Sequence, residues 1–139
     1  TRSALPPLTP VMWLRKGAGQ KSLGRRGEDE AASALTRRGL AIVDRNVRSR
    51  LGEIDLVARD GQTLVFVEVK SRRGSGGDPP EASVTPEKQR RLARLALGYL
   101  KMKRLGDVPC RFDVVAVTLD DGDRVSKIRH LPGAFIAHE

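Results

Sequence analysis

The chain has 139 residues, the length of one domain, and its single cysteine, Cys110, excludes an intramolecular disulfide and a metal site built from thiolates. No run of 18 apolar residues is present, so we expect no transmembrane helix, and the cysteine content suits the reducing cytoplasm. The 26 Lys and Arg residues outnumber the 17 Asp and Glu residues, and the resulting net charge of +9 favours a polyanionic partner such as nucleic acid. A soluble protein that is basic without such a partner is the plainer alternative.

The N-terminal part of the chain is predicted to contain a leader and then a helix. Residues 1–20 hold several prolines and no apolar core of a signal peptide, so we expect a flexible leader there and a single domain over residues 21–139. A helix is predicted over residues 23–38, because apolar residues recur at helical spacing. Ser22 is a suitable N-cap, and Gly39 suits the position after the last turn.

Three strands are predicted to follow this helix. Residues 40–48 and 53–59 mix apolar and polar positions, as half-buried strands do. Asp60-Gly61 is a strong signal for a two-residue hairpin turn, and it leads into a third strand over residues 63–70.

A loop and a second helix are predicted after the third strand. Residues 71–84 are rich in glycine and proline, which indicates a loop. Thr85 and Pro86 can open a helix as its N-cap and its first residue. The expected apolar stripe of this helix consists of Leu92, Leu95, Ala96, Tyr99 and Met102. Its many Lys and Arg residues are typical of a solvated face, and they also suit a nucleic-acid contact.

Two apolar runs predict the architecture. Further strands are expected over residues 111–118 and 124–130, and the runs 64–67 and 114–117 lack alternation. Strands that are apolar on both faces must be covered on both faces, and a helix between them is long enough to make them parallel. We therefore expect an α/β fold in which a mixed sheet is flanked by helices on both faces, in the order α-β-β-β-α-β-β.

Charged residues on the predicted hairpin form a candidate site. Side chains alternate along a strand, so Glu53 and Asp55 are expected to share one face of the second strand, while Ile54 and Leu56 take the other. The third strand ends in charged residues, so Asp55 can approach Glu68 across the hairpin. Several carboxylates would then gather at one edge of an apolar sheet.

This grouping of like charges points to a divalent cation. Carboxylates repel one another when buried, and Mg²⁺ or Mn²⁺ relieves that repulsion with the oxygen ligands it prefers. Lys70, on the same face as Glu68, can orient a water or stabilise the charge that develops on a phosphate. Alternatively, Glu68 and Lys70 form ordinary ion pairs at a strand end, and Asp55 pairs with an arginine.

Several strings of the chain resemble a known nuclease motif. The strings Gly52–Leu56 and Phe66–Arg72 look like the PD-(D/E)XK motif and, more narrowly, like the YraN-like family of bacterial proteins. Further matches lie at Gly24–Glu28, Asn46, Thr85–Lys88 and Arg111–Asp113, so the resemblance covers about residues 21–119. It implies a restriction-endonuclease-like α-β-β-β-α-β core, similar to that of archaeal Holliday-junction resolvases.

The resemblance also implies roles for site residues. The implied catalytic residues are Asp55, Glu68, Lys70 and Glu28. Asp55, Glu68 and the carbonyl oxygen of Val69 would bind Mg²⁺ or Mn²⁺, while Glu53 matches the motif with an unsettled role. The residues expected to hold a nucleic-acid backbone are Arg25, Arg26, Arg72 and Lys88.

We therefore expect a metal-dependent endonuclease that hydrolyses phosphodiester bonds, with DNA of branched or other structured form as the favoured substrate. Cutting a junction as resolvases do needs two sites, so a homodimer is a candidate assembly. The main alternative is a nuclease fold that binds nucleic acid or a partner protein without turnover, and a scaffold for structured RNA is a third.

Other residues have plainer expectations. Tyr99 is expected to pack in the core, and His130 and His138 are expected to be exposed or to lie in the C-terminal tail. Ser71 lacks a neighbouring base, so nucleophilic catalysis by serine is not expected.

Overall fold

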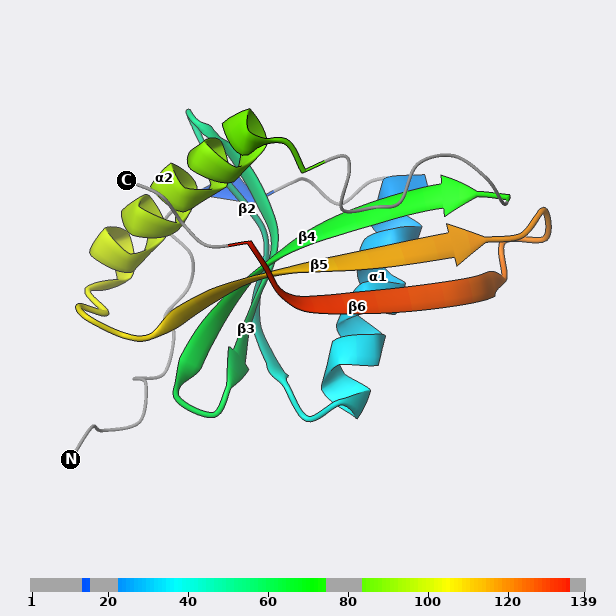
Figure 1. Ribbon diagram of the computed structural model, residues 1–139, viewed down its shortest axis with the longest axis horizontal. Helices are drawn as coiled ribbons and strands as arrows, with labels where there is room; N and C mark the ends of the chain where they lie inside the picture. The colour runs from blue at the N-terminus through cyan, green and yellow to red at the C-terminus, as the bar shows by residue number, and fades with distance from the viewer. Residues whose placement is uncertain (1–13, 16–22, 75–83, 136–139) are drawn as a thin grey trace.

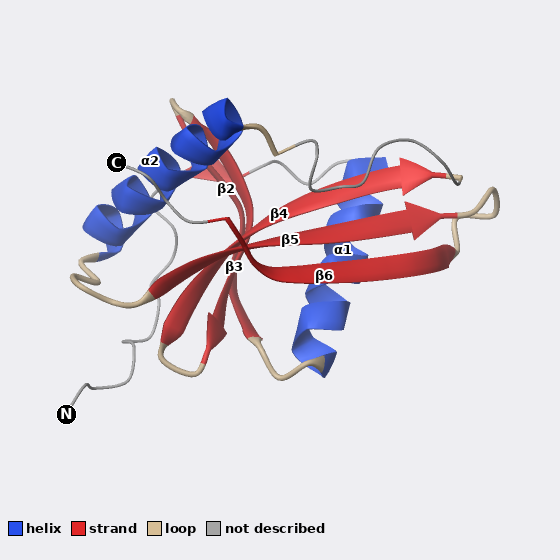
Figure 2. Ribbon diagram, viewed as in Figure 1, coloured by secondary structure: helices blue, strands red, loops and turns tan. Residues whose placement is uncertain are grey.

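The computed structural model describes residues 14–15, 23–74 and 84–135. Two helices flank one six-stranded sheet, whose strands lie side by side in chain order (Figures 1 and 2). The elements are β1 (Leu14–Arg15), α1 (Leu23–Arg37), β2 (Ala41–Ser49), β3 (Gly52–Asp60), β4 (Thr63–Arg73), α2 (Pro86–Lys103), β5 (Cys110–Leu119) and β6 (Val125–Phe135). Strands β4 and β5 are parallel, and the other neighbours are antiparallel.

The predicted α/β architecture is confirmed, because the sheet is mixed and a helix covers each face. One core cluster joins α2 to the sheet through residues such as Phe66, Leu95 and Tyr99. The other joins α1 to the opposite face through residues such as Leu35 and Val65. Neighbouring positions of β4 therefore bury their side chains on opposite faces, which explains the unbroken apolar run.

Helix α2 begins as the sequence predicts. The backbone N–H of Lys88 donates to the hydroxyl oxygen of Thr85, and Pro86 is the first helical residue. Such a cap stabilises a helix by about 1 kcal/mol. The expected apolar stripe is wrong at Met102, which is 40% exposed, because the buried residues of α2 end one turn earlier at Tyr99.

The β3–β4 hairpin forms, but its turn lies one residue later than the sequence signal indicates. Asp60 pairs with Thr63, so the two turn residues are Gly61 and Gln62. Gly61 has a φ of 60°, a left-handed conformation that glycine adopts without steric cost.

Strand β4 extends into the predicted loop. Its parallel ladder with β5 continues to the pair Arg73 and Leu119, so Ser71, Arg72 and Arg73 are strand residues. Strand β5 supplies the hydrogen-bond partners for this extension of β4, and such long-range pairing cannot be inferred from the local sequence. The central part of the predicted loop, like Ser22 and His138, lies outside the described residues.

Part of the predicted leader has described structure. Leu14 and Arg15 form the short edge strand β1, which pairs antiparallel with Arg48 and Val47 of β2. The rest of residues 1–20 lies outside the described residues. Neither described helix is long and apolar enough to cross a membrane.

Candidate functional site

Strands β3 and β4 separate where the candidate residues lie. Their ladder ends at the pair Leu56 and Val67. Beyond it, the backbone N–H of Val69 donates to Oδ2 of Asp55 at 2.8 Å, so a carboxylate replaces the backbone partner. We call this opening, bounded by Asp55 and the segment Glu68–Lys70, the strand fork.

The expected alternation of β3 is wrong at the strand fork. Ile54 packs in the core cluster of α2, whereas Leu56 packs in that of α1, so these two residues lie on opposite faces. On the neighbouring strand, Asn46 lies between the paired residues Arg45–Leu56 and Val47–Ile54 and has a φ of 51°. A left-handed residue interrupts the two-residue period of its own strand, here β2, beside the irregular part of β3, and asparagine tolerates that conformation better than most residues.

Four carboxylates converge on the strand fork. Burial raises the pKa of Asp55 well above its usual value, and the negative charge of Glu68 raises it further. Glu28 and Glu53 add to this rise, and the hydrogen bond from Val69 only partly offsets it. Glu28, on α1, is 5% exposed. The structure thus brings together the acidic residues singled out in the sequence, from α1, β3 and β4.

A pair of lysines lies against these carboxylates. Nζ of Lys70 lies 3.3 Å from Oε2 of Glu68. Burial opposes the charged form of Lys70, but a hydrogen bond with Lys88 and the charge of Glu68 outweigh it and raise its pKa. The same hydrogen bond is the main cause that lowers the pKa of Lys88, at the start of α2. Lys88, expected to contact only a nucleic-acid backbone, therefore belongs to the charged cluster itself.

Gly27 allows α1 to approach β4 closely enough to deliver Glu28. A Cβ atom at Gly27 would lie 1.7 Å from Oγ of Ser71 and 2.8 Å from its Cβ. Sequence reasoning missed both Gly27 and Ser71 as positioning residues. A glycine inside a predicted helix was the available signal, because it weakens a helix unless close packing requires it.

The predicted backbone-binding residues lie around the same end of β4. Nη2 of Arg26 donates to the carbonyl of Asp123 at 3.0 Å and pairs with Glu30 at 3.4 Å. Nε of Arg72 donates to Oγ1 of Thr118 at 3.4 Å. Arg25, near the start of α1, is half-buried. Arg26 and Arg72 therefore lie near the strand fork, although Arg26 already pairs with Glu30.

Comparison with known proteins places the chain in a family. The model of "Uncharacterised protein family UPF0102" matches residues 27–117. The chain belongs to the UPF0102 family. A UPF0102 protein of Geotalea uraniireducens is 52% identical over 118 residues, which cover 85% of this chain and 92% of that protein. One from Anaeromyxobacter dehalogenans is 47% identical over 119 residues, covering 86% and 87% of the two chains.

This membership confirms the narrower of the two resemblances, the one to the YraN-like family. The matched region of this UPF0102 chain begins at Gly27 and ends at Val117, so it contains Glu28 and the whole strand fork. The names of the relatives state no activity.

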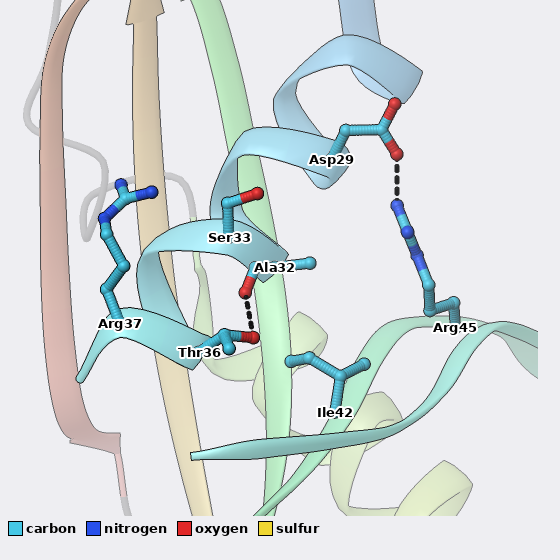
Figure 3. A pocket seen from close by; sticks show the side chains of 7 residues that line it. All are labelled: Asp29, Ala32, Ser33, Thr36, Arg37, Ile42 and Arg45. Atoms are coloured by element: carbon cyan, nitrogen blue, oxygen red, sulfur yellow. Dashed lines mark hydrogen bonds and ion pairs between the residues drawn. The ribbon is translucent and has the colours of Figure 1, made fainter. Parts of the chain in front are cut away.

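A separate groove of this UPF0102 protein lies between α1 and β2 (Figure 3). It is an open surface groove of about 760 Å³, lined by Asp29, Ala32, Ser33, Thr36, Arg37, Ile42 and Arg45. An ion pair between Asp29 and Arg45 joins α1 to β2, and the hydroxyl of Thr36 donates to the carbonyl of Ala32. None of the predicted site residues lines this groove.

A second charged cluster holds β5 to β6. Asp113 is fully buried and accepts two hydrogen bonds from Arg111, while Nε2 of His130 lies 2.7 Å from its Oδ2. The expectation of an exposed His130 is therefore wrong, since its side chain is 5% exposed. Pairing of β6 with β5 places this histidine against a buried carboxylate, and that contact is invisible in local sequence.

Replacing Gly27 with Ala should destabilise this UPF0102 protein by about 1–3 kcal/mol, because the new methyl overlaps Ser71. The same change in an open helix would instead stabilise it by about 0.5–1 kcal/mol. Urea denaturation measures the difference. Gly122→Ala is the control, because its Cβ would lie 3.5 Å from Asp120, an ordinary contact. Equal stabilities of the two variants would contradict the close approach of α1.

Proposed function

We propose that this UPF0102 protein is a metal-dependent endonuclease with a restriction-endonuclease-like core of the PD-(D/E)XK type. The order from α1 to β5, α-β-β-β-α-β, supports this assignment. The observation that carries it is the carboxylate of Asp55 in the strand fork, where burial and the charges of Glu68, Glu28 and Glu53 oppose its ionisation. A group so perturbed, next to a lysine, is typical of a catalytic centre.

The residues of the strand fork suit a divalent cation. Among the described residues, no three His, Cys, Asp or Glu side chains are already arranged as a metal-binding group. Asp55 and Glu68 would hold Mg²⁺ or Mn²⁺ together with the carbonyl oxygen of Val69, an all-oxygen set of the kind these ions prefer. A positive ion would also relieve the mutual repulsion of the carboxylates.

The protein's own residues would perform the remaining steps. A bound divalent cation supplies Lewis-acid polarisation of the phosphodiester. Lys70 keeps its proton, because Glu68 and Lys88 stabilise its charged form, so it would stabilise negative charge on the phosphate or orient a water. Glu28 would complete the outer shell of the site from the side of α1.

The proposed substrate class rests on the net charge of +9 and on the resemblance to resolvases. Arg25, Arg26, Arg72 and Lys88 would hold phosphates, which gives affinity with little sequence readout. DNA is the favoured substrate, in a branched or otherwise structured form. In a homodimer, each of the two copies of the chain would cut one strand. The competing proposal is a module that binds nucleic acid without cutting it.

The deciding experiment incubates the protein with supercoiled plasmid and with four-way junction DNA. Cleavage should need Mg²⁺ or Mn²⁺ and stop in EDTA, and Lys70→Ala should slow it at least about 100-fold. Lys101→Ala is the matched control, since it removes one cation about 20 Å along α2 from Lys88. Equal rates for both variants would contradict the role of Lys70.

Binding without cleavage would favour the alternative. If four cations each neutralise a phosphate, the slope of log K against log salt should be about −3 to −4. The same slope with no product under either metal would indicate a non-catalytic binding module. Stronger binding of structured RNA than of DNA in competition would indicate an RNA-associated scaffold.

A further inference from the structure

The turn between β5 and β6 carries acidic residues that contact two arginines from other elements. Nη2 of Arg26, on α1, donates to the carbonyl oxygen of Asp123 at 3.0 Å. Nη1 of Arg73, at the end of β4, forms an ion pair with Oδ1 of Asp123. The same nitrogen donates to the carbonyl of Asp120 at 3.4 Å. Asp123 thus binds Arg26 through its backbone carbonyl and Arg73 through its carboxylate. Arg26 also pairs with Glu30 at 3.4 Å.

The turn holds Asp123 in a defined position. Oδ1 of Asp120 accepts hydrogen bonds from the backbone N–H groups of Gly122 and Arg124, each at 2.9 Å. Asp123 itself has a φ of 62°, a left-handed conformation that aspartate and asparagine tolerate. The contact is therefore supported by a structured turn rather than by one side chain alone.

The two arginines border the strand fork. Arg26 directly precedes Gly27, which packs against Ser71 of β4. Arg73 lies three residues beyond Lys70 on the same strand. Figure 1 shows the β5–β6 turn beside the end of β4, at one end of the molecule. Arg73 lies two residues beyond Ser71 and so on the same sheet face, the one covered by α1, and a nucleic-acid strand that crosses the fork on that face would pass over this end.

These contacts are exposed and easily replaced. The side chain of Arg26 is 38% exposed, and those of Arg73 and Asp123 are 45% and 61% exposed. Ion pairs with this exposure add little to stability. Guanidinium groups bind phosphate oxygens with the same fork geometry that they use for carboxylates, and a phosphate offers more charge and more acceptors.

We propose that Arg26 and Arg73 form a phosphate-binding subsite that Asp123 occupies in the free protein and that a backbone phosphate of nucleic acid takes over. This inference rests on the proposed function, because it assigns one of the phosphates next to the strand fork. Asp123 acts as an internal competitor, which lowers affinity for any polyanion that does not reach both arginines at once.

The test measures affinity for a fluorescein-labelled DNA duplex and a four-way junction by anisotropy, in EDTA so that no cleavage occurs. Asp123→Asn should tighten binding about two- to fivefold, because the competing charge is lost while asparagine keeps the left-handed turn. Asp121→Asn is the control, since Asp121 is exposed in the same turn and its replacement changes net charge equally. It should change affinity by less than about 1.5-fold.

A second variant shows which residues receive the phosphate. Adding Arg73→Ala to Asp123→Asn should remove the gain in affinity. Equal gains in DNA affinity for Asp121→Asn and Asp123→Asn would show a general charge effect and overturn this inference. The proposed function would still stand in that case, provided that the wild-type protein binds DNA. No binding of any nucleic acid by the wild-type chain at low salt would instead overturn both.

Discussion

Replacing Asp55 with Asn should reduce metal-dependent cleavage at least about 100-fold and, at the same time, make the metal-free protein more stable. Asparagine can still accept the hydrogen bond from the N–H of Val69, so the strand fork keeps its geometry. It lacks the charge that burial and the neighbouring carboxylates oppose. A residue that costs stability while it serves function is expected at an active site.

The pH dependence of this effect has a definite sign. The folded-state pKa of Asp55 is raised above the usual value of 3.8, so wild-type stability falls as pH rises from that value through the folded pKa. Asp55→Asn lacks this loss. Its melting temperature without metal should exceed that of the wild type at pH 7 by several degrees, and the difference should vanish near pH 4.

Metal addition should reverse the order of stability. Mn²⁺ at about 100 times its Kd should stabilise the wild type by about 2.7 kcal/mol and leave Asp55→Asn nearly unchanged. Asp121→Asn, an exposed change of the same type, should respond to metal as the wild type does. A lower melting temperature for Asp55→Asn than for the wild type in EDTA at pH 7 would contradict the assignment.

The sheet could be predicted from sequence because its signals are local. The unbroken apolar runs of β4 and β5, with a helix between them, indicate parallel strands covered on both faces, and the structure has them. Alternation failed in β3 beside an irregularity of its partner strand. Ile54 and Leu56 pack on opposite faces, and Asn46 of β2, whose φ is left-handed, lies between their pairing partners.

The candidate site could be predicted only where its residues are close in sequence or match a motif. Asp55, Glu68 and Lys70 lie on one hairpin, so their approach follows from strand pairing. The contact of Gly27 with Ser71 joins residues far apart in the chain, and only the packing of α1 on β4 reveals it. Lys88 reaches Lys70 because α2 starts beside the strand fork, a placement that helix periodicity does not specify.

The largest loss of stability is expected from Asp113→Ala. Asp113 is fully buried, and its carboxylate accepts hydrogen bonds from Nε and Nη2 of Arg111 at 2.9 and 3.1 Å. It also accepts one from the N–H of Gly133 at 2.9 Å and contacts His130. Removing one partner of a buried charged cluster costs about 3–5 kcal/mol, a large share of the 5–15 kcal/mol typical of a domain. Urea denaturation at an unchanged m-value measures this loss.

An exposed partner of the same arginine provides the control. Asp60 also pairs with Arg111, at 2.9 Å, but its side chain is 48% exposed, so Asp60→Ala should cost less than about 1 kcal/mol. Comparable losses for the two variants would contradict the argument from burial.

Acid should reduce the penalty of Asp113→Ala. Burial alone would raise the pKa of Asp113, but the hydrogen bonds from Arg111, His130 and Gly133 outweigh it, and the pKa is lowered. A lowered folded pKa contributes stability above the usual value of 3.8 and loses it as pH falls through the folded value. The two aspartates thus act in opposite directions at neutral pH. The ionised carboxylate of Asp113 stabilises the fold, whereas that of Asp55 in the strand fork destabilises it.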